Sequence, residues 1–314
     1  MTRLPTNLSP LSRMAVLTLL LLLASTAIIA ALRVIRPGRY VAELSARLRS
    51  WWIMATVFFS AVALSNGISL VFFGFLSFWA LKEYVTLLDT RPEDHSALVL
   101  YFLTIPLQYY WAAIGWYGMF TVFIPVCIFL LVPAQLALAQ GTAGFLASTS
   151  QLQWGAMAFV FSLSHLAFLL QLPPISTNPQ VNGRSLVLFL VFVVETSDVL
   201  QYVWGKTLGR HKVLPVVSPN KTWEGLIGGI ASATLLSVLI RFLTPFTAPE
   251  TLLVSLLVTV TGFCGGAVMS TLKRDLGVKD FGVLIPGHGG MLDRVDSLCY
   301  AAPLFLLYVR AFHY

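Results

Sequence analysis

Long uninterrupted runs of apolar residues recur from near the start of the chain to its end. A hydropathy window finds about ten runs long enough for a membrane-spanning helix, with boundaries good to about 2–4 residues. The run 51–81 has no charged residue and is too long for one helix, so a break is expected at Asn66-Gly67. The predicted spans run near residues 14–32, 51–65, 67–87, 97–113, 118–138, 152–172, 185–207, 225–243, 251–272 and 293–312. This pattern predicts an all-α fold, a polytopic integral membrane helical bundle of about nine to ten transmembrane helices.

Charged residues beside the spans predict how the bundle is oriented. Three arginines between residues 33 and 39 directly follow the first span. This flank favours a retained first helix, with its C-terminal end in the cytoplasm, over a cleaved signal peptide. Residues 40–49 are predicted to form a short amphipathic helix lying on the cytoplasmic surface. Alternation then places both termini outside and the polar loops 209–224 and 273–296 inside, across a bacterial-type inner or plasma membrane.

The composition excludes several classes of protein. Of the 314 residues, 57% are hydrophobic and only 11% are charged, and the mean hydropathy is +0.82. Residues 96–183 contain no Asp, Glu, Lys or Arg, and a soluble globule could not cover its surface with such a segment. A soluble enzyme, a disordered chain and a secreted disulfide scaffold are therefore excluded. The basic residues that give the net charge of +7 lie largely beside apolar spans. They are therefore interpreted as setting the orientation in the membrane, and no nucleic-acid partner is predicted.

Charge is concentrated in two segments of the second half of the chain. Residues 195–224 and 273–296 hold seven of the 13 acidic and eight of the 20 basic residues. We therefore expect residues 1–180 to supply N-terminal transmembrane helices that face lipid and act as a scaffold. Residues 181–314 are expected to form a C-terminal catalytic region with cytoplasmic motif loops. The charges at the end of the third span, among them Glu83, are interpreted as an interfacial helix end.

The predicted seventh span carries acids inside its apolar run. Four polar residues share one face of this helix within an arc of about 80°. They are Glu195, Asp198, Tyr202 and Lys206. An acid within a transmembrane helix is costly and indicates function by default. Paired carboxylates suit a hard cation with oxygen ligands, such as Mg²⁺, although an internal salt bridge with a neighbouring helix is the alternative.

A polar loop after this span leads into the next predicted helix. It contains Ser218, Lys221 and Thr222, and Pro219 is expected to form a turn. Backbone N–H groups at a helix N-terminus, the helix dipole and a lysine together suit a phosphate group. The alternative is a helix cap combined with lysines that only set the orientation.

The segment 270–297 combines carboxylates with cationic residues. Asp293 and Asp296 are three residues apart at the start of the last span, so they share a face, and Asp280 adds a carboxylate from the loop. The cations that supply charge for phosphates are Lys273, Arg274, Lys279 and Arg294. A carboxylate cluster flanked by cations fits Mg²⁺-assisted phosphoryl or nucleotidyl transfer.

The stretch 286–290 is a loop whose bare backbone can approach a ligand closely. It includes His288, Gly289 and Gly290. We expect His288 to contact a phosphate or to order the loop, because Mg²⁺ prefers oxygen ligands to imidazole.

These residues resemble the signature of the phosphatidate cytidylyltransferase (CDP-diacylglycerol synthase) family. The run 270–296 looks like S-x-x-K-R-x4-K-D…P-x-H-G-G-x-x-D-R-x-D and meets every fixed position. The stretch from Asp198 to Thr222 is also similar to an upstream motif of that family. Glu195 is an additional acid, and Val199 and Gln201 stand where the family has small residues.

The resemblance implies a reaction and a set of site residues. CTP and phosphatidate would give CDP-diacylglycerol and pyrophosphate with Mg²⁺ as cofactor, at a cytosol-facing site of an integral membrane homodimer. The catalytic residues would be Asp198, Lys273, Asp280, Asp293 and Asp296. The substrate-binding residues would be Lys206, Ser218, Lys221, Thr222, Arg274, Lys279, His288, Gly289, Gly290 and Arg294. The metal ligands would be Asp198, Asp280, Asp293 and Asp296, with Glu195 as a further candidate.

Two other functions are compatible with the sequence. One is CTP-dependent transfer to another membrane lipid, such as a polyprenol or another phospholipid. The other is transport of an anionic metabolite, with coupling through Glu195 and Asp198. Many transporters show internal repeats and polar sites at the bilayer midplane. No repeat is visible here, and most of the charge lies at the predicted cytoplasmic ends of the spans.

Overall fold

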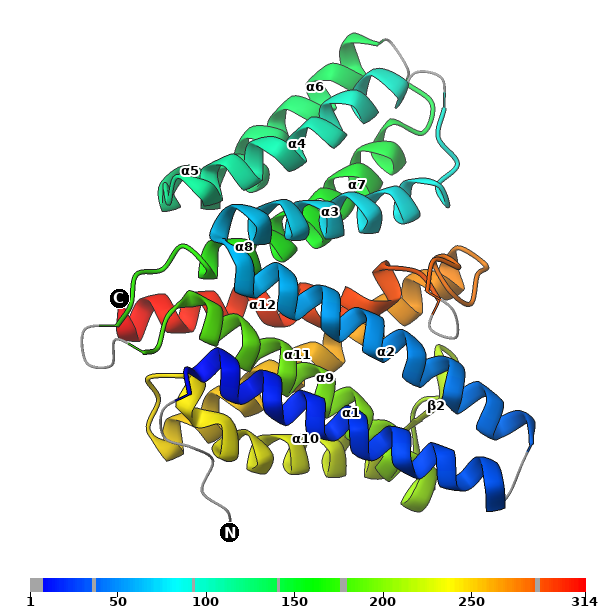
Figure 1. Ribbon diagram of the computed structural model, residues 1–314. Helices are drawn as coiled ribbons and strands as arrows, with labels where there is room; N and C mark the ends of the chain where they lie inside the picture. The colour runs from blue at the N-terminus through cyan, green and yellow to red at the C-terminus, as the bar shows by residue number, and fades with distance from the viewer. Residues whose placement is uncertain (1–7, 36–37, 92–93, 140–141, 176–179, 286–288) are drawn as a thin grey trace.

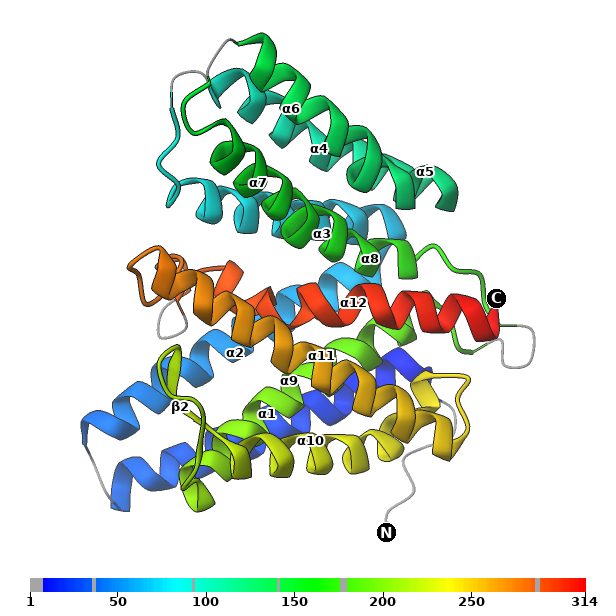
Figure 2. The same cartoon turned by 180° about the vertical axis from the view of Figure 1, so that it is seen from behind.

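The structure is a computed structural model that describes all residues except 1–7, 36–37, 92–93, 140–141, 176–179 and 286–288 (Figures 1 and 2). In the first half the elements are α1 (Pro10–Ile35), α2 (Arg39–Leu64), α3 (Asn66–Val85), α4 (His95–Ala113), α5 (Tyr117–Val122), η2 (Phe123–Ile128), α6 (Phe129–Leu138), α7 (Phe145–Gly155), η3 (Ala156–Phe161) and α8 (Ser162–Leu169). In the second half they are α9 (Gly183–Leu208), β1 (Lys212–Leu214), β2 (Ser218–Thr222), α10 (Trp223–Ser237), η4 (Val238–Leu243), α11 (Ala248–Asp275) and α12 (Leu292–His313). The described chain is almost entirely helical, which confirms the predicted all-α membrane fold.

Every predicted span corresponds to a helical segment. Within the described ranges, eight helices are long and apolar enough to cross a membrane. The apolar part of α4, Ala97–Ala113, is shorter, and the first half of α2 carries charged residues. The break between α2 and α3 falls at Ser65, next to the expected Asn66-Gly67. Residues 40–49 are helical as predicted, but they do not form a short helix of their own, because they continue without a break into the rest of α2. Their position on the cytoplasmic surface stays a prediction.

Figures 1 and 2 show helices arranged on either side of α12. On one side lie α4 to α7, with α3 and α8 between them and α12. On the other side lie α1, α9, α10 and α11, and α2 runs from their far end toward α3. Because α12 packs against α11, α8, α9 and α3, both halves of the chain meet on it. The division near residue 180 stays a prediction.

Small and aromatic side chains allow α12 to lie inside the bundle. Ala301 and Ala302 are fully buried, and Phe305 stacks on Phe189 of α9 with ring centroids 6.0 Å apart. In a bilayer, lipid tails are as apolar as the side chains, so close packing rather than water exclusion holds helices together. This packing fixes the position of a helix whose first turns carry Asp293 and Asp296.

A buried acid anchors the link between α3 and α4. Asp94 accepts hydrogen bonds from the Arg91 backbone N–H at 3.0 Å, from the Arg91 guanidinium at 2.9 Å and from Ser148 Oγ of α7 at 3.0 Å. Burial alone would raise the pKa of Asp94. The hydrogen bonds and the charge of Arg91 outweigh burial and lower this pKa below its ordinary value of 3.8. The ionised carboxylate therefore joins this link to α7.

A short hairpin stands where the sequence predicted only a turn. Strands β1 and β2 are antiparallel and are joined by residues 215–217. The prediction for Pro219 is wrong, because Pro219 lies within β2 and not in the turn. A proline is tolerated there because each strand of a two-stranded sheet keeps an open edge. Thr222 ends β2 and caps α10, with Thr222 Oγ1 accepting from the Gly225 N–H at 3.1 Å.

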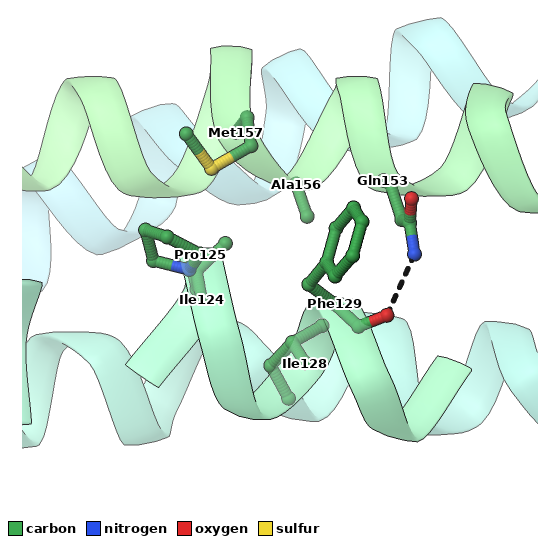
Figure 3. Close-up of a pocket in the computed structure, with 7 residues that line it drawn as sticks. All are labelled: Ile124, Pro125, Ile128, Phe129, Gln153, Ala156 and Met157. Atoms are coloured by element: carbon green, nitrogen blue, oxygen red, sulfur yellow. Dashed lines mark hydrogen bonds between the residues drawn. The ribbon is translucent and has the colours of Figure 1, made fainter. Parts of the chain in front are cut away.

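An apolar groove opens between α6 and α7, walled by the π-helical turns η2 and η3 (Figure 3). Gln153 Nε2 donates a hydrogen bond of 2.8 Å to the carbonyl oxygen of Phe129 across it. The other lining residues are Ile124, Pro125, Ile128, Ala156 and Met157. No charged side chain lines this groove, so it is separate from the polar residues that the motifs predicted.

Candidate active site

One hydroxyl group joins an acid of α9 to an acid of α12. Ser297 Oγ donates a hydrogen bond of 2.7 Å to Asp198 Oδ2 and lies 3.4 Å from Asp296 Oδ1. The Ser297 backbone N–H also donates to Asp296 Oδ1 at 2.7 Å. Two positions 99 residues apart in sequence are therefore in direct contact. We call Asp198 and Asp296, which are both partly buried, the acidic pair.

Gly266 of α11 lies against the acidic pair. A Cβ atom added at Gly266 would lie 3.1 Å from Lys221 Nζ and 3.5 Å from Ser297 Oγ. It would also lie 3.9 Å from Asp296 Oδ2. The missing side chain thus allows an ammonium, a hydroxyl and a carboxylate to approach one point on α11. The sequence reasoning missed both Gly266 and Ser297, since neither belongs to a recognised motif.

The ammonium group of Lys221 is held beside the acidic pair. Lys221 Nζ lies 4.9 Å from the centre of the Phe263 ring of α11, within cation–π range. Burial lowers the pKa of Lys221 below its ordinary value, and the charges of Asp198 and Asp296 oppose this effect. A lysine ammonium has three donors and suits a phosphate oxygen.

Asp293, in the first turn of α12, is engaged by three protein groups. Asp293 Oδ1 accepts from Lys273 Nζ at 2.8 Å. Asp293 Oδ2 accepts from the backbone N–H groups of Phe281 and Gly290, both at 2.9 Å. The side chain is only 3% exposed. Asp293 therefore connects the end of α11, the α11–α12 loop (residues 276–291) and the start of α12.

Gly289 allows the loop to pass close to Asp293. Its φ of +81° lies in the left-handed region that favours glycine. A Cβ atom there would lie 2.8 Å from Asp293 Oδ2 and 3.3 Å from Asp280 Cβ. Asp280 thus flanks Gly289, but it is exposed.

Glu83, near the end of α3, reaches the same loop from the first half of the chain. Glu83 Oε1 accepts from the Met291 N–H at 2.9 Å, and Glu83 Oε2 accepts from the Leu292 N–H at 2.8 Å. The residue is only 9% exposed. Glu83 does lie in the last turn of α3, but interpreting it only as an interfacial helix end misses its contacts with the start of α12. Its position inside the predicted span 67–87 was a usable signal, because an acid within a span indicates function.

Arg274 connects α11 to the hairpin. Arg274 Nε donates a hydrogen bond of 3.1 Å to the carbonyl oxygen of Val217. Arg274 is otherwise exposed, so its remaining guanidinium donors are accessible. With Lys221 beside α11, this contact brings the charged segment 195–224 against the charged segment 273–296.

Further polar groups surround Asp198. Gln201 Nε2 donates to Ser197 Oγ at 3.0 Å and lies 3.5 Å from Asp198 Oδ1. This departure from the family pattern therefore places an amide beside the acid. Glu195 interacts electrostatically with Asp198 and Arg294, so it belongs to the same charged region. The Nε atom of Arg294 is buried and has no hydrogen-bond partner among the residues that the structure describes.

Other predicted substrate-binding residues lie apart from these contacts. Lys206 and Lys279 are exposed and form no hydrogen bond or ion pair with another described residue. Lys206 is more than two turns beyond Asp198, about 12 Å further along α9. Ser218 is at the start of β2. His288 lies outside the described residues.

The predicted metal ligands are divided between two places. In the part of the chain that the structure describes, no three His, Cys, Asp or Glu side chains are close enough to hold one metal ion. Asp198 and Asp296 contact one hydroxyl, whereas Asp293 binds Lys273 and Asp280 is exposed. The four aspartates therefore do not form one ligand set. The acidic pair still fits Mg²⁺, which is commonly bound by one or two carboxylates together with substrate phosphates.

Comparisons with known proteins agree with the motifs. A model of the cytidylyltransferase family matches residues 45–312. The uncharacterized protein YnbB of Escherichia coli is 44% identical over 275 residues, covering 87% of this chain and 90% of that protein. A phosphatidate cytidylyltransferase of Staphylococcus haemolyticus is 30% identical over 265 residues, covering 80% and 94%. One of Staphylococcus aureus is 40% identical over 124 residues, covering 39% and 48%. The resemblance predicted from the motifs is thereby confirmed.

Proposed function

The chain belongs to the cytidylyltransferase family, and we propose that it transfers the cytidylyl group of CTP to phosphatidate, giving CDP-diacylglycerol and pyrophosphate. The observation that carries this proposal is the contact of one hydroxyl with both members of the acidic pair, with Lys221 beside them. The apolar helices make the chain an integral membrane protein, and its family makes it a transferase. We propose that it acts as a homodimer and that the site faces the cytoplasm of a bacterial-type cell, since the motif loops carry the positive charge.

The proposed reaction needs alignment and charge neutralisation more than covalent help from the protein. An ionised phosphate oxygen of phosphatidate forms a bond to the α-phosphorus of CTP. The bond from that phosphorus to the oxygen bridging the α- and β-phosphates breaks, and pyrophosphate leaves with the electron pair. Because the attacking oxygen is already ionised, we assign no general base. The barrier comes from repulsion between anions and from misalignment.

The acidic pair would hold Mg²⁺, and its residues fit that ion. Both groups are carboxylates, the ligand type that Mg²⁺ prefers. Both carboxylates contact one hydroxyl, so their negative charges lie close together, and a divalent cation would offset the repulsion between them. When bound, Mg²⁺ neutralises charge on the phosphates of CTP and orients them.

The basic residues would contact the phosphates around this pair. Lys221 presents its ammonium beside the acids, and Arg274 adds accessible donors at the edge of the hairpin. Lys273 is fixed by Asp293 and so keeps a defined position. We assign Asp293 the role of ordering Lys273 and the loop, because its oxygens already accept hydrogen bonds from the protein.

The proposal is tested with purified protein in detergent, Mg²⁺ and CTP labelled at the α- or the γ-phosphate. The lipids supplied are phosphatidate, lysophosphatidate, a polyprenol and a polyprenyl phosphate. We expect the α-label on phosphatidate and one pyrophosphate released for each lipid modified. Transfer of the γ-label would indicate a kinase, and α-label on another lipid alone would change the acceptor. A complete lack of turnover without sealed vesicles would favour a transporter.

A matched pair of variants tests the acidic pair. Asp296→Asn removes one charge beside the shared hydroxyl and should reduce turnover on the order of 100-fold or more, since metal-assisted charge neutralisation contributes several kcal/mol. Asp275→Asn makes the same chemical change at an exposed acid of α11 and should leave turnover near that of the wild type. Robust activity of folded Asp296→Asn protein would contradict the assignment.

A further inference from the structure

We propose that Glu83 is a positioning residue, which sets where α12 begins and thereby places Asp293, Asp296 and Ser297. The kinetic part of this inference rests on the proposed function. Its structural part does not, because it concerns the backbone of the α11–α12 loop. Through Glu83, the first half of the chain would help to position the site, in addition to the scaffold role predicted for it.

The start of α12 has no cap from its own sequence. The N-cap residue is Met291, whose side chain makes no capping hydrogen bond. The first N–H groups of a helix have no partner within the helix and need acceptors from elsewhere. Glu83 supplies two such acceptors, to Met291 and Leu292, from 208 and 209 residues earlier in the sequence. A side chain of α3 thus holds the N-terminal end of α12.

The loop leaves room for the Glu83 carboxylate. A Cβ atom added at Gly282 would lie 2.6 Å from Glu83 Oε1, and one added at Gly290 would collide with Glu83 Oε2. Any other residue at either position would push the loop or the carboxylate away. Glu83 therefore lies between the loop backbone at Gly282 and at Gly290, and it also binds the start of α12.

The charge of Glu83 is suited to this position. A carboxylate at a helix N-terminus is favoured by the helix dipole, and its hydrogen bonds with backbone N–H groups are stronger than those of a neutral acceptor. The adjacent Lys82 instead lies over the Trp79 ring, 4.3 Å from its centre. Within the described ranges Glu83 forms no ion pair, so backbone donors stabilise its charge. A glutamine has the same shape but only one acceptor oxygen.

A displaced helix start would move the site as a unit. Asp293, Asp296 and Ser297 lie on the first turns of α12, and Asp296 contributes half of the acidic pair. Misplacing reacting groups by about 1 Å costs on the order of 100-fold in rate. We therefore expect Glu83 to affect kcat without touching either substrate.

The experiment compares Glu83→Gln and Glu83→Asp with Asp89→Asn, an exposed acid that follows α3. We expect Glu83→Gln to lower kcat on the order of 10- to 100-fold, with a smaller change in the KM for CTP. Glu83→Asp keeps the charge and both oxygens and should partly rescue kcat. Hydrogen exchange should accelerate in the peptide that contains Met291 and Leu292 for Glu83→Gln. Asp89→Asn should match the wild type in both measurements.

Wild-type kcat together with wild-type exchange in Glu83→Gln would overturn the inference. A kcat that is unchanged per folded molecule, with only the unfolding temperature lowered, would also overturn it by leaving Glu83 a stabilising role alone. If Glu83→Gln does not fold, Glu83→Asp is judged by the same two readouts. If the wild type transfers no cytidylyl group but exchange still accelerates, the proposed function fails and the positioning role stands.

Discussion

Replacing Gly266 with alanine adds one methyl group beside the acidic pair. The new Cβ would lie 3.1 Å from Lys221 Nζ, a separation tighter than an ordinary contact, so the ammonium must move by a few tenths of an ångström. That atom is the end of a flexible side chain, so the fold should tolerate the change. Since a misplacement of about 1 Å costs on the order of 100-fold, we expect kcat/KM to fall about 10-fold.

The same substitution should not weaken the fold. Alanine in a helix interior is favoured over glycine by roughly 0.5–1 kcal/mol, so the unfolding temperature should stay the same or rise. Activity and stability would therefore change in opposite directions, which a simple packing defect would not produce. The assay measures pyrophosphate release and thermal unfolding on the same purified samples.

Gly262→Ala is the matched control for Gly266→Ala. It adds the same methyl group one turn earlier on α11, where the Cβ would meet Val194 Cγ1 at 3.4 Å, an ordinary contact between apolar atoms. We expect its activity to stay near that of the wild type. If Gly266→Ala is as active as Gly262→Ala, Lys221 and the acidic pair are not at the reacting phosphates.

Three further variants test other contacts. Ser297→Ala leaves Asp198 without its short hydrogen bond and should lower kcat/KM about 10-fold, whereas Ser255→Ala, at a buried hydroxyl without a described partner, should not. The lowered pKa of Asp94 implies a contribution to stability that is complete above the ordinary pKa of 3.8 and is lost as the pH falls below it. Asp94→Asn should therefore unfold at lower temperature near pH 7, and the difference from the wild type should shrink toward pH 3 in a thermal melt. Thr222→Ala removes the α10 cap and should cost about 1 kcal/mol of stability, which Thr222→Ser restores.

The apolar spans could be predicted from the sequence because a bilayer imposes one simple requirement on every helix. Length and apolar composition decide whether a segment can span, and both are read directly from the chain. The hairpin of β1 and β2 could not be predicted from the sequence. Strand β2 contains Pro219 and Asn220, which are poor strand formers. Part of its support comes from Arg274 on α11, a contact that no local pattern reveals.

Site residues were predictable where they belong to a motif and not where they act through distant contacts. Asp198 and Asp296 could be named from helix position and motif spacing. Ser297 and Glu83 could not be assigned their roles, because those roles arise from partners 99 and more than 200 residues away. Helix spacing alone also grouped Asp293 with Asp296, although loop N–H groups and Lys273 occupy the oxygens of Asp293.

The fit between Glu83 and the glycines at positions 282 and 290 also limits how this protein can be recombined with its relatives. A chimera that joins the first half of one homologue to the second half of another would take the acid on α3 from one parent and the two glycines from the other. Without both glycines, side chains in the loop would occupy the space of the carboxylate. Such a hybrid should work only when both parents carry the acid and both glycines. In evolution, these three positions should change together.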